Sequence, residues 1–336
     1  MMFPISYALF FFTLILGSLI SISSSSWFGG WVGLELNMLS FIPLITLKMN
    51  SYFSEAALKY FLIQALGSAL FIYASCVSIS FYNLTHIFTL FALLLKLAAA
   101  PFHFWFPQVV EGLHWPQMFI LSTIQKLAPM VLISYLTSFP ILTKTITVSA
   151  VLSALVGAWS GLNLTLLRKI LAFSSINHMS WMLIAISISD TLWFMYFMFY
   201  SLISLSVMMM FYKTQAFSLS QVTQSNQTSA LYKITLSLSM LSLGGLPPLS
   251  GFIPKWMIAQ IMMNMKMMIP LFFLLASALV TLYFYLRISI PLFIMYSPSS
   301  NFNMKHTIMT PTSTLFIIFT SFNLYGMLLP LYPLLI

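Results

Sequence analysis

Long apolar runs, separated by short polar interruptions, follow one another along the whole chain. The hydrocarbon core of a bilayer is about 30 Å thick, so about 20 residues of helix are needed to cross it. Residues 3–22 form such a run without a charged side chain, and similar runs follow throughout. Short strands of alternating polarity, which build membrane barrels, are absent from the pattern. The pattern therefore predicts an all-α polytopic membrane protein.

We place eleven transmembrane helices near residues 3–22, 27–47, 55–82, 86–105, 117–138, 145–164, 168–188, 191–212, 228–264, 269–296 and 312–332. No basic residue precedes the first run, so we expect it to be a retained span rather than a cleaved signal peptide. The longest polar stretches lie near 213–227 and 297–310, which is too short for a soluble domain. We expect three parts, residues 1–138, 139–296 and 297–336.

Composition supports a membrane location and removes several classes of protein. Only 5% of the residues are charged, against about 25% in ordinary soluble domains, and 60% are hydrophobic. This balance excludes a soluble enzyme, a disordered chain and a secreted disulfide scaffold. The single Cys76 cannot form an internal disulfide or a cysteine metal site. The net charge is +9, but only Arg168 and Lys169 are adjacent, so no nucleic-acid partner is expected.

The loops between the predicted spans differ in their content of basic residues. Loops on the side of the N-terminus contain Lys48, Arg168, Lys169, Lys213 and Lys305, whereas those on the opposite side contain Lys144 and Lys266. Positive loops stay on the cytoplasmic or mitochondrial matrix side, so we expect the N-terminus there. An odd number of spans then places the C-terminus on the other side.

Four ionisable residues fall deep inside predicted spans, namely Glu35, Lys96, Lys126 and Lys255. A charge at membrane depth is costly, and such residues usually mark an ion path or a charged partner. The alternative is that the four are snorkelling ends or buried structural pairs. None lies close enough to a predicted helix end to reach the interface easily, which favours a role in transport.

Glu35 is the only acidic residue in the middle of a span, so we expect it to pair with a lysine rather than to face lipid. It lies nearly opposite a stripe of small and polar residues on the same helix, because two residues turn a helix by about 200°. That stripe contains Gly29, Gly33, Asn37 and Ser40. Small residues allow two helices to approach closely, so the stripe predicts a helix contact on the side away from Glu35.

Two of the predicted spans contain proline-rich interruptions, at residues 96–107 and 243–255. Proline removes a backbone donor and clashes with the preceding turn, so each span should break there, although a simple kink is the alternative. If helices 1–5 and 6–10 form two units, each break falls in the fourth helix of its unit. Five is odd, so the second unit is inverted. Interruptions at matching positions of inverted halves point to the ion site of a transporter.

Two histidines inside or beside these spans are candidate proton relays, because imidazole titrates near neutral pH. His178 lies near the start of the seventh predicted helix, and His103 follows the first break. The alternative for each is a buried histidine held by hydrogen bonds. Glu55 and Lys59 are four residues apart and predict an ordinary helical salt bridge, and Arg287 predicts a structural or lipid-facing anchor.

At these residues the chain resembles the antiporter-like membrane subunits of respiratory complex I, NADH:ubiquinone oxidoreductase. The resemblance covers essentially the whole chain. It rests on six motifs in the order of the family: Trp31-Val-Gly-Leu-Glu-Leu-Asn37, Glu55-Ala-Ala-Leu-Lys-Tyr-Phe61, Lys96-Leu-Ala-Ala-Ala-Pro-Phe-His-Phe-Trp105, Gln125-Lys-Leu-Ala-Pro129, Ser174-Ser-Ile-Asn-His-Met-Ser-Trp181 and Gly244-Gly-Leu-Pro-Pro-Leu-Ser-Gly-Phe-Ile-Pro-Lys-Trp256. The resemblance implies two inverted five-helix bundles, with broken fourth and ninth helices, plus one flanking helix.

The resemblance also implies a role for each deep charge in proton pumping. By position, Glu35 matches the acidic residue of the input half-channel and Lys96 its lysine partner on the first broken helix. Lys126 matches the central lysine, and Lys255 the lysine of the second broken helix. Burial disfavours a charged lysine whereas a nearby carboxylate favours it, so a Glu35–Lys96 pair that opens and closes would switch the proton affinity of neighbouring lysines.

No cofactor site is expected in this chain. Gly29-Gly30-Trp-Val-Gly33 lacks the strand and the later acidic residue of a dinucleotide loop, and no histidine and carboxylate cluster has metal-ligand spacing. The resemblance places NADH, FMN, iron–sulfur clusters and ubiquinone in partner chains. It implies as partners a second antiporter-like chain, the small three-helix chain, accessory subunits and membrane lipids, in the mitochondrial inner membrane with the N-terminus in the matrix. Two alternatives remain, a cation/proton antiporter subunit and a non-transporting scaffold.

Overall fold

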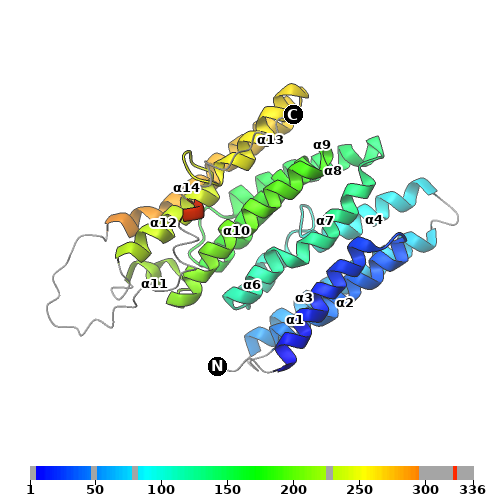
Figure 1. Ribbon diagram of the computed structural model, residues 1–336, viewed down its shortest axis with the longest axis horizontal. Coiled ribbons are helices and arrows are strands. Elements are labelled where there is room, and N and C mark those ends of the chain that lie inside the picture. Colours follow the sequence, from blue (N-terminus) through cyan, green and yellow to red (C-terminus); the bar gives the residue numbers. More distant parts are fainter. Residues whose placement is uncertain (1–4, 47–50, 78–81, 225–229, 295–320, 324–336) are drawn as a thin grey trace.

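The computed structural model describes residues 5–46, 51–77, 82–224, 230–294 and 321–323. The described residues form helices, with one isolated bridge between Leu166 and Ser218. The helices, labelled in Figure 1, are α1 (Ile5–Ser23), α2 (Trp27–Ile45), α3 (Ser51–Val77), α4 (Tyr82–Leu97), α5 (Trp105–Glu111), α6 (Trp115–Ser122), α7 (Ile124–Leu136), α8 (Pro140–Ser160), α9 (Leu167–Ile188), α10 (Asp190–Thr214), α11 (Leu219–Gln224), α12 (Ala230–Gly244), α13 (Phe252–Asn264) and α14 (Met268–Ile294).

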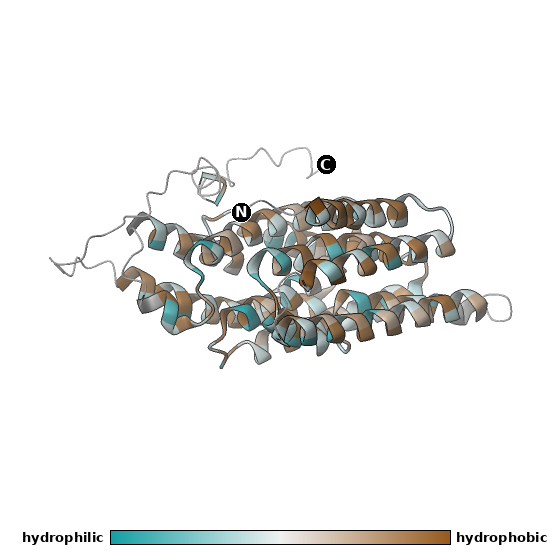
Figure 2. Cartoon of the chain, turned by 90° about the horizontal axis from the view of Figure 1, so that it is seen from below, coloured by the Kyte–Doolittle hydropathy of each residue, from teal (hydrophilic) through white to brown (hydrophobic). Residues whose placement is uncertain are grey.

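The long helices form a slab in which α9 is central and α1 and α14 are on the outside (Figure 1). Eight helical stretches of the described chain are long and apolar enough to cross a membrane: α1, α2, α3, α6 with α7, α8, α9, α10 and α14. Figure 2 shows hydrophobic residues along most of their length. The predicted all-α membrane fold is therefore confirmed. The predicted span 312–332 lies outside the described residues except for 321–323, so the count of eleven stays a prediction.

Some predicted helix ends were wrong by a few residues. The third span was predicted at 55–82, but α3 covers Ser51–Val77, and the sixth was predicted at 145–164, but α8 covers Pro140–Ser160. Pro140 occupies the first turn of α8, where its fixed φ suits a helix and its missing N–H costs nothing. The start of α2 was predicted correctly, at residue 27. The Ser26 hydroxyl fixes this start, because it caps the helix by accepting the Gly29 N–H at 3.2 Å.

Both predicted breaks are confirmed, and the simple kink is wrong. Residues 98–104 separate α4 from α5, and residues 245–251 separate α12 from α13. Each interruption begins with a residue of positive φ, Ala98 at 59° and Gly245 at 82°, which ends the helix before it. The fourth predicted span, 86–105, therefore ends as a helix at Leu97.

The two breaks have the same length and lie 147 positions apart in the sequence. The residue of positive φ moves from 98 to 245, and the start of the following helix moves from 105 to 252. A second correspondence, at a spacing of 140, involves two glycine contacts. A Cβ on Gly17 would lie 2.8 Å from Asn37 N, and a Cβ on Gly157 would lie 2.8 Å from Asn177 N. The contact between α1 and α2 thus has the same design as the contact between α8 and α9.

A third interruption, which the sequence reading missed, divides the predicted span 117–138. Thr123, with φ −120° and ψ −78°, separates α6 from α7. The Lys126 N–H consequently donates to Thr123 O at 2.9 Å instead of to the carbonyl four residues earlier. Pro129 lies in the next turn and has no N–H for the Gln125 carbonyl, which weakens the same stretch of helix. Lys126 therefore stands at a helix discontinuity.

Candidate functional site

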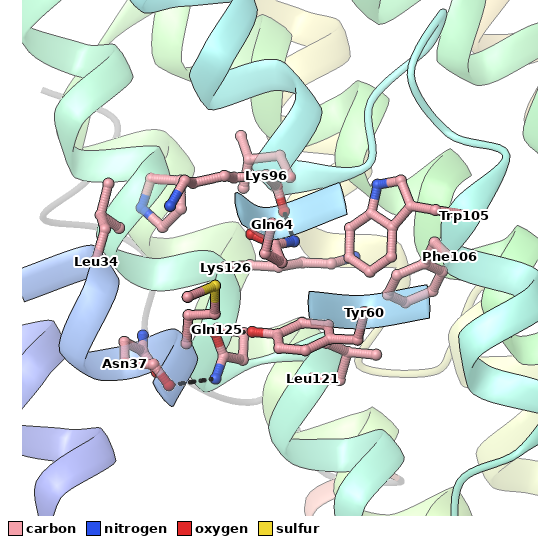
Figure 3. Close-up of a pocket in the computed structure, with 13 residues that line it drawn as sticks. Leu34, Asn37, Tyr60, Gln64, Lys96, Trp105, Phe106, Leu121, Gln125 and Lys126 are labelled. Carbon is pink, nitrogen blue, oxygen red and sulfur yellow. Dashed lines mark hydrogen bonds between the residues drawn. The ribbon is translucent and has the colours of Figure 1, made fainter. Parts of the chain in front are cut away.

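A buried polar pocket lies among α2, α3, α5, α7 and the end of α4, next to the first break. The cavity has room for about one water molecule. Figure 3 shows that polar side chains from separate helices face this pocket. Its polar lining residues are Asn37, Tyr60, Gln64, Lys96, Gln125 and Lys126. The first half of the molecule thus brings two of the four predicted site residues, Lys96 and Lys126, to one place.

Lys96 occupies the last turn of α4, immediately before the first break, and is buried. Gly67 on α3 leaves room for its side chain, because a Cβ there would lie 3.1 Å from Lys96 Cγ. The break itself is tied together by Trp105, whose indole N–H donates to Leu95 O at 3.1 Å. Gln64 Nε2 lies 3.5 Å from Lys96 O and donates to it. These contacts fix the helix end that presents Lys96 to the pocket.

Glu35 lies on α2 and is partly buried, but it does not line the pocket. It interacts electrostatically with both Lys96 and Tyr60. Among the described residues, no lysine nitrogen lies within 4.0 Å of a carboxylate oxygen of Glu35, so the predicted Glu35–Lys96 pair interacts here without direct contact. Glu35 Oε2 and the indole nitrogen of Trp31, one turn earlier, are buried and have no hydrogen-bond partner among the described residues. Such groups cost about 1–3 kcal/mol each, which favours rearrangement or hydration at this position.

The α1–α2 contact lies on the side of α2 that the small-residue stripe predicted. A Cβ on Gly33 would lie 2.4 Å from Ser21 N and 2.6 Å from Gly17 O, so the backbones of α1 and α2 touch there. This close approach fixes the rotation of α2. It leaves Glu35 on a different side of that helix, within electrostatic range of Tyr60 on α3 and Lys96 on α4.

Lys126, in the first turn of α7, is buried between the first break and α9. Its ammonium lies 4.8 Å from the centre of the Phe106 ring, at the start of α5. Its Nζ donates to Ser175 Oγ on α9 at 3.4 Å. No described carboxylate pairs with it. The described contacts of this ammonium are therefore a hydroxyl and an aromatic ring rather than a counter-ion.

His178 lies three residues after Ser175 on α9 and is buried. Its Nδ1 forms a 2.9 Å hydrogen bond with the Tyr196 hydroxyl, and its ring lies 5.0 Å from that of Tyr200. It interacts electrostatically with both Lys126 and Lys255. The Tyr200 hydroxyl is within hydrogen-bonding range of Ser175, the partner of Lys126. His178 and two tyrosines therefore occupy the space between the two lysines.

Lys255 lies in the first turn of α13, after the second break, and its side chain turns back across that break. Its Nζ donates to Gly244 O at 2.8 Å and to Leu243 O at 3.3 Å. These carbonyls belong to the last turn of α12, where the helix dipole favours a cation. Gly245 is required here, because a Cβ would lie 2.9 Å from Lys255 Cδ and the residue has φ 82°.

His103 is not part of this line of residues. It is buried within the first break, its ring lies 4.1 Å from that of Phe104, and it interacts with the Pro101 backbone. Within the described chain no hydrogen bond joins it to a lysine of the site, and its Nδ1 has no partner. Its relay role stays a prediction, and its surroundings favour the alternative of a histidine held in place.

The ionisable residues predicted to be structural are paired as expected. Lys59 and Glu55 form an exposed 2.6 Å salt bridge. Arg287 donates to two carbonyls of the loop between α8 and α9, Leu162 O at 2.7 Å and Leu164 O at 2.9 Å. Within the described residues, no cluster of histidine, cysteine and carboxylate side chains could hold a metal ion.

The chain is similar to known proteins over nearly its whole length. A family model described as NADH:quinone oxidoreductase/Mrp antiporter, TM, matches residues 76–281. NADH-ubiquinone oxidoreductase chain 2 of Anopheles gambiae is 41% identical over 334 residues, which is 97% of each chain. The protein of the same name from Loxodonta africana is 40% identical and covers 98% of each chain. The chain belongs to the NADH-ubiquinone oxidoreductase chain 2 family.

Solved structures share the fold of this chain 2 family member. A chain of "Respiratory complex I from Thermus thermophilus with bound Aureothin" superposes with a TM-score of 0.81 at 24% identity, over 97% of this chain and 78% of that one. A chain of the Mrp complex from Dietzia superposes with a TM-score of 0.70 at 15% identity, over 82% of this chain and 58% of that one. At these identities the likeness concerns the fold.

Several residues of the site were not predicted from the sequence. Ser175 bonds to Lys126, Tyr196 bonds to His178, and the Tyr200 ring lies against that of His178. Gln64 and Gln125 line the pocket. Their residue types are frequent in helix contacts, so only their mutual geometry distinguishes them. Lys233, which is buried in α12, was also missed, although a lysine inside the predicted span 228–264 was a visible signal.

Proposed function

We propose that this chain is a proton-translocating membrane-arm subunit of complex I. It would couple electron transfer from NADH to ubiquinone, carried out in other chains, to proton pumping across the mitochondrial inner membrane. The observation that supports this most strongly is a series of four buried titratable groups, Lys96, Lys126, His178 and Lys255. The first two line one pocket, and His178 interacts electrostatically with Lys126 and Lys255. The series extends from the first broken helix to the second.

The surroundings of these lysines suit a site that gains and loses a proton. A permanent buried ammonium requires a counter-ion or full hydrogen bonding, because an isolated charge is costly in apolar surroundings. In the described part of the chain, the ammonium groups of Lys126 and Lys255 contact a hydroxyl, an aromatic ring and carbonyl oxygens. Both charged and neutral amines can form such contacts. A proton placed on one lysine repels protons on the next, so charge can pass along the series.

In this series, Glu35 adjusts the proton affinity of the first lysine, Lys96. A carboxylate favours protonation of a nearby lysine, and the effect grows steeply as the distance falls. Glu35 interacts with Lys96 without touching it. Movement of α2 or α4 that brings them together would attract a proton to Lys96, and separation would pass it towards Lys126. This is the switch predicted from the sequence, with an open pair as its described state.

The corresponding breaks, 147 positions apart, and the corresponding glycine contacts, 140 positions apart, support two inverted units. These would be residues 1–138 and 139–296, followed by residues 297–336 with a final helix. The units would contain five transmembrane helices each, with breaks in the fourth and ninth. At a spacing of 140, the position of Glu35 corresponds to Ser175, just as Gly17 and Asn37 correspond to Gly157 and Asn177. Lys126 contacts Ser175, so each unit would present a polar residue of its second helix to a lysine.

The distribution of basic loops supports an N-terminus in the matrix and a C-terminus in the intermembrane space. The partners would be a second antiporter-like chain, the small three-helix chain and accessory subunits, with lipid on the remaining surface. NADH, FMN, iron–sulfur clusters and ubiquinone would be bound by those partner chains. Copurification of this chain with the flavin and iron–sulfur chains in mild detergent tests this assignment.

The test of function is the substitution Lys126→Ala in the assembled complex. Membrane vesicles containing the complex would be given NADH, and proton uptake and NADH oxidation would be measured together. We expect fewer protons pumped for each NADH oxidised, with the amount of complex largely unchanged. The control is Lys59→Ala, which removes an exposed lysine paired with Glu55. Full pumping by Lys126→Ala would instead support a scaffold.

The second candidate function is a cation/proton antiporter subunit, because the matching family model names both kinds of protein. The two functions differ in their need for NADH. An antiporter exchanges sodium or potassium for protons down a cation gradient, whereas a complex I subunit moves protons only when NADH is oxidised. Cation-driven proton exchange in vesicles without NADH, abolished by Lys126→Ala, would favour the antiporter.

A further inference from the structure

Asn323 belongs to a segment far along the chain from the second break, yet it lies against that break and is buried. Its backbone carbonyl accepts the Ser250 N–H at 3.2 Å. Its Oδ1 lies 3.3 Å from Ser242 Oγ and accepts from that hydroxyl. Its Nδ2 donates to Ser206 Oγ on α10 at 3.4 Å. One residue therefore bonds to the end of α12, to the break and to α10.

These bonds are formed where the two ends of the break meet. A Cβ on Gly251 would lie 1.7 Å from Ser242 O, so the chain after the break packs directly on the last turn of α12. Ser242 immediately precedes Leu243 and Gly244, whose carbonyls accept from the Lys255 ammonium. Asn323 thus holds the helix end that supplies the two acceptors of Lys255, although it does not bond to Lys255 itself.

Two features of this closed arrangement favour its exchange for another. The Ser242 hydroxyl has one proton, which it shares between Ser239 O at 2.7 Å and Asn323 Oδ1 at 3.3 Å. The Ser250 hydroxyl is buried without a partner among the residues that the structure describes. A buried unsatisfied hydroxyl is unfavourable, so an arrangement in which water or another group bonds to it recovers part of the cost of opening.

We propose that Asn323 is a positioning residue, a latch that keeps the second break closed beneath Lys255 and releases it during proton transfer. This inference rests on the proposed function. With the latch closed, Leu243 O and Gly244 O hold the ammonium at the end of α12. When the bonds to Ser242 and Ser250 are lost, the break separates, the two carbonyls move, and Lys255 exchanges them for water.

The substitution Asn323→Leu tests the latch, because leucine has a similar volume and cannot bond to Ser242 or Ser206. Vesicles with the assembled complex would be assayed for complex content, NADH oxidation and protons pumped for each NADH across a range of pH. We expect fewer protons pumped for each NADH and a shifted pH profile of pumping. The matched control is Phe322→Leu, which alters the neighbouring side chain, packed 5.8 Å from the Phe199 ring. We expect Phe322→Leu to leave the protons pumped for each NADH and the pH profile of pumping unchanged.

A purely structural role would lower the amount of complex while each remaining complex pumped normally with an unshifted pH profile, and that result would overturn the proposal. If Asn323→Leu fails to assemble, the double variant Ser206→Ala and Ser242→Ala removes both side-chain partners with little change of volume. Normal pumping by the double variant would also overturn the latch. The substitution Lys255→Ala distinguishes a failure of the latch from a failure of the proposed role of Lys255. Defective Lys255→Ala with normal latch variants rejects the latch alone, whereas normal pumping by Lys255→Ala rejects the role of Lys255 on which it rests.

Discussion

Within the part of the chain that the structure describes, no carboxylate is in contact with a buried lysine. Lys126 bonds to Ser175 and faces Phe106, and Lys255 bonds to two carbonyls at a helix end. A buried ion pair is a stable endpoint, and breaking it is strongly destabilising. Contacts with neutral groups hold a lysine in place in both its charged and its neutral state. Proton transfer requires a lysine that can change between these two states.

This reasoning predicts a loss of pumping for Lys126→Arg. Guanidinium keeps its proton throughout the accessible pH range, so the charge remains at this position while the ability to release a proton is lost. We expect fewer protons pumped for each NADH oxidised, measured in vesicles with the assembled complex. The control is Lys59→Arg, an exposed lysine in a salt bridge, which should pump normally. Full pumping by Lys126→Arg would remove Lys126 from the proton path.

A second prediction concerns Glu35. Glu35→Gln keeps the size of the side chain but removes the charge that acts on Lys96. We expect slower coupled turnover, whereas Glu35→Asp keeps part of it because the charge is retained. Both would be measured as NADH-driven proton uptake, with Glu55→Gln as the exposed control. Equal turnover of Glu35→Gln and the unchanged chain would show that the charge has no role.

The sequence was sufficient to identify four deep charges, because an ionisable residue within an apolar run is visible without a structure, although Lys233 was missed. It was not sufficient to predict their contacts. Contact between Glu35 and Lys96 depends on the rotation of α2 and α4 about their axes, which the Gly17–Gly33 contact and the first break determine. Ser175 became a partner of Lys126 through packing of α7 against α9.

At the scale of elements, proline was a reliable signal where it occurred in clusters. Both clusters interrupt their helices, and both interruptions begin at a residue of positive φ. The single Pro129 was a weaker signal, and the division at Thr123 lies six residues before it, so its position could not be read from the proline. Membrane helices tolerate isolated prolines, because neighbouring groups satisfy the freed carbonyl.

The contact between α1 and α2 yields a prediction for Gly33→Ala. The added Cβ would lie 2.4 Å from the Ser21 backbone nitrogen, so the helices must separate. Overpacking of this kind costs typically about 1–3 kcal/mol. We expect a lower thermal midpoint of the assembled complex and less of it in the membrane. The control on the same helix is Gly30→Ala, whose Cβ would meet Leu132 Cδ2 at an ordinary 3.5 Å. Equal stability of the two variants would contradict the close contact.

At the scale of the whole molecule, the two outermost helices expose apolar side chains along their length. On α1 these include Leu9, Phe12 and Leu19, and on α14 they include Ile269, Phe272 and Leu279. A soluble protein of this size does not leave so much apolar surface in water. Lipid or neighbouring membrane subunits must cover both sides of the slab, and the loss of either should destabilise the chain.

The outer side of α14 offers a matched test of this cover. Leu279 and Ile294 are equally exposed, at 71% and 70%, but Leu279 is near the middle of Met268–Ile294 and Ile294 is its last residue. An arginine at the centre of a transmembrane helix costs about 2.5–3.5 kcal/mol, whereas one at the end extends to the interface.

We expect Leu279→Arg to lower the amount of assembled complex by roughly tenfold or more, since 1.4 kcal/mol corresponds to a factor of ten. Ile294→Arg should have little effect, because its guanidinium reaches water or lipid headgroups. The amount of complex in native gels of detergent-extracted membranes measures both. Similar amounts for the two variants would mean that the middle of α14 is not covered by apolar surroundings.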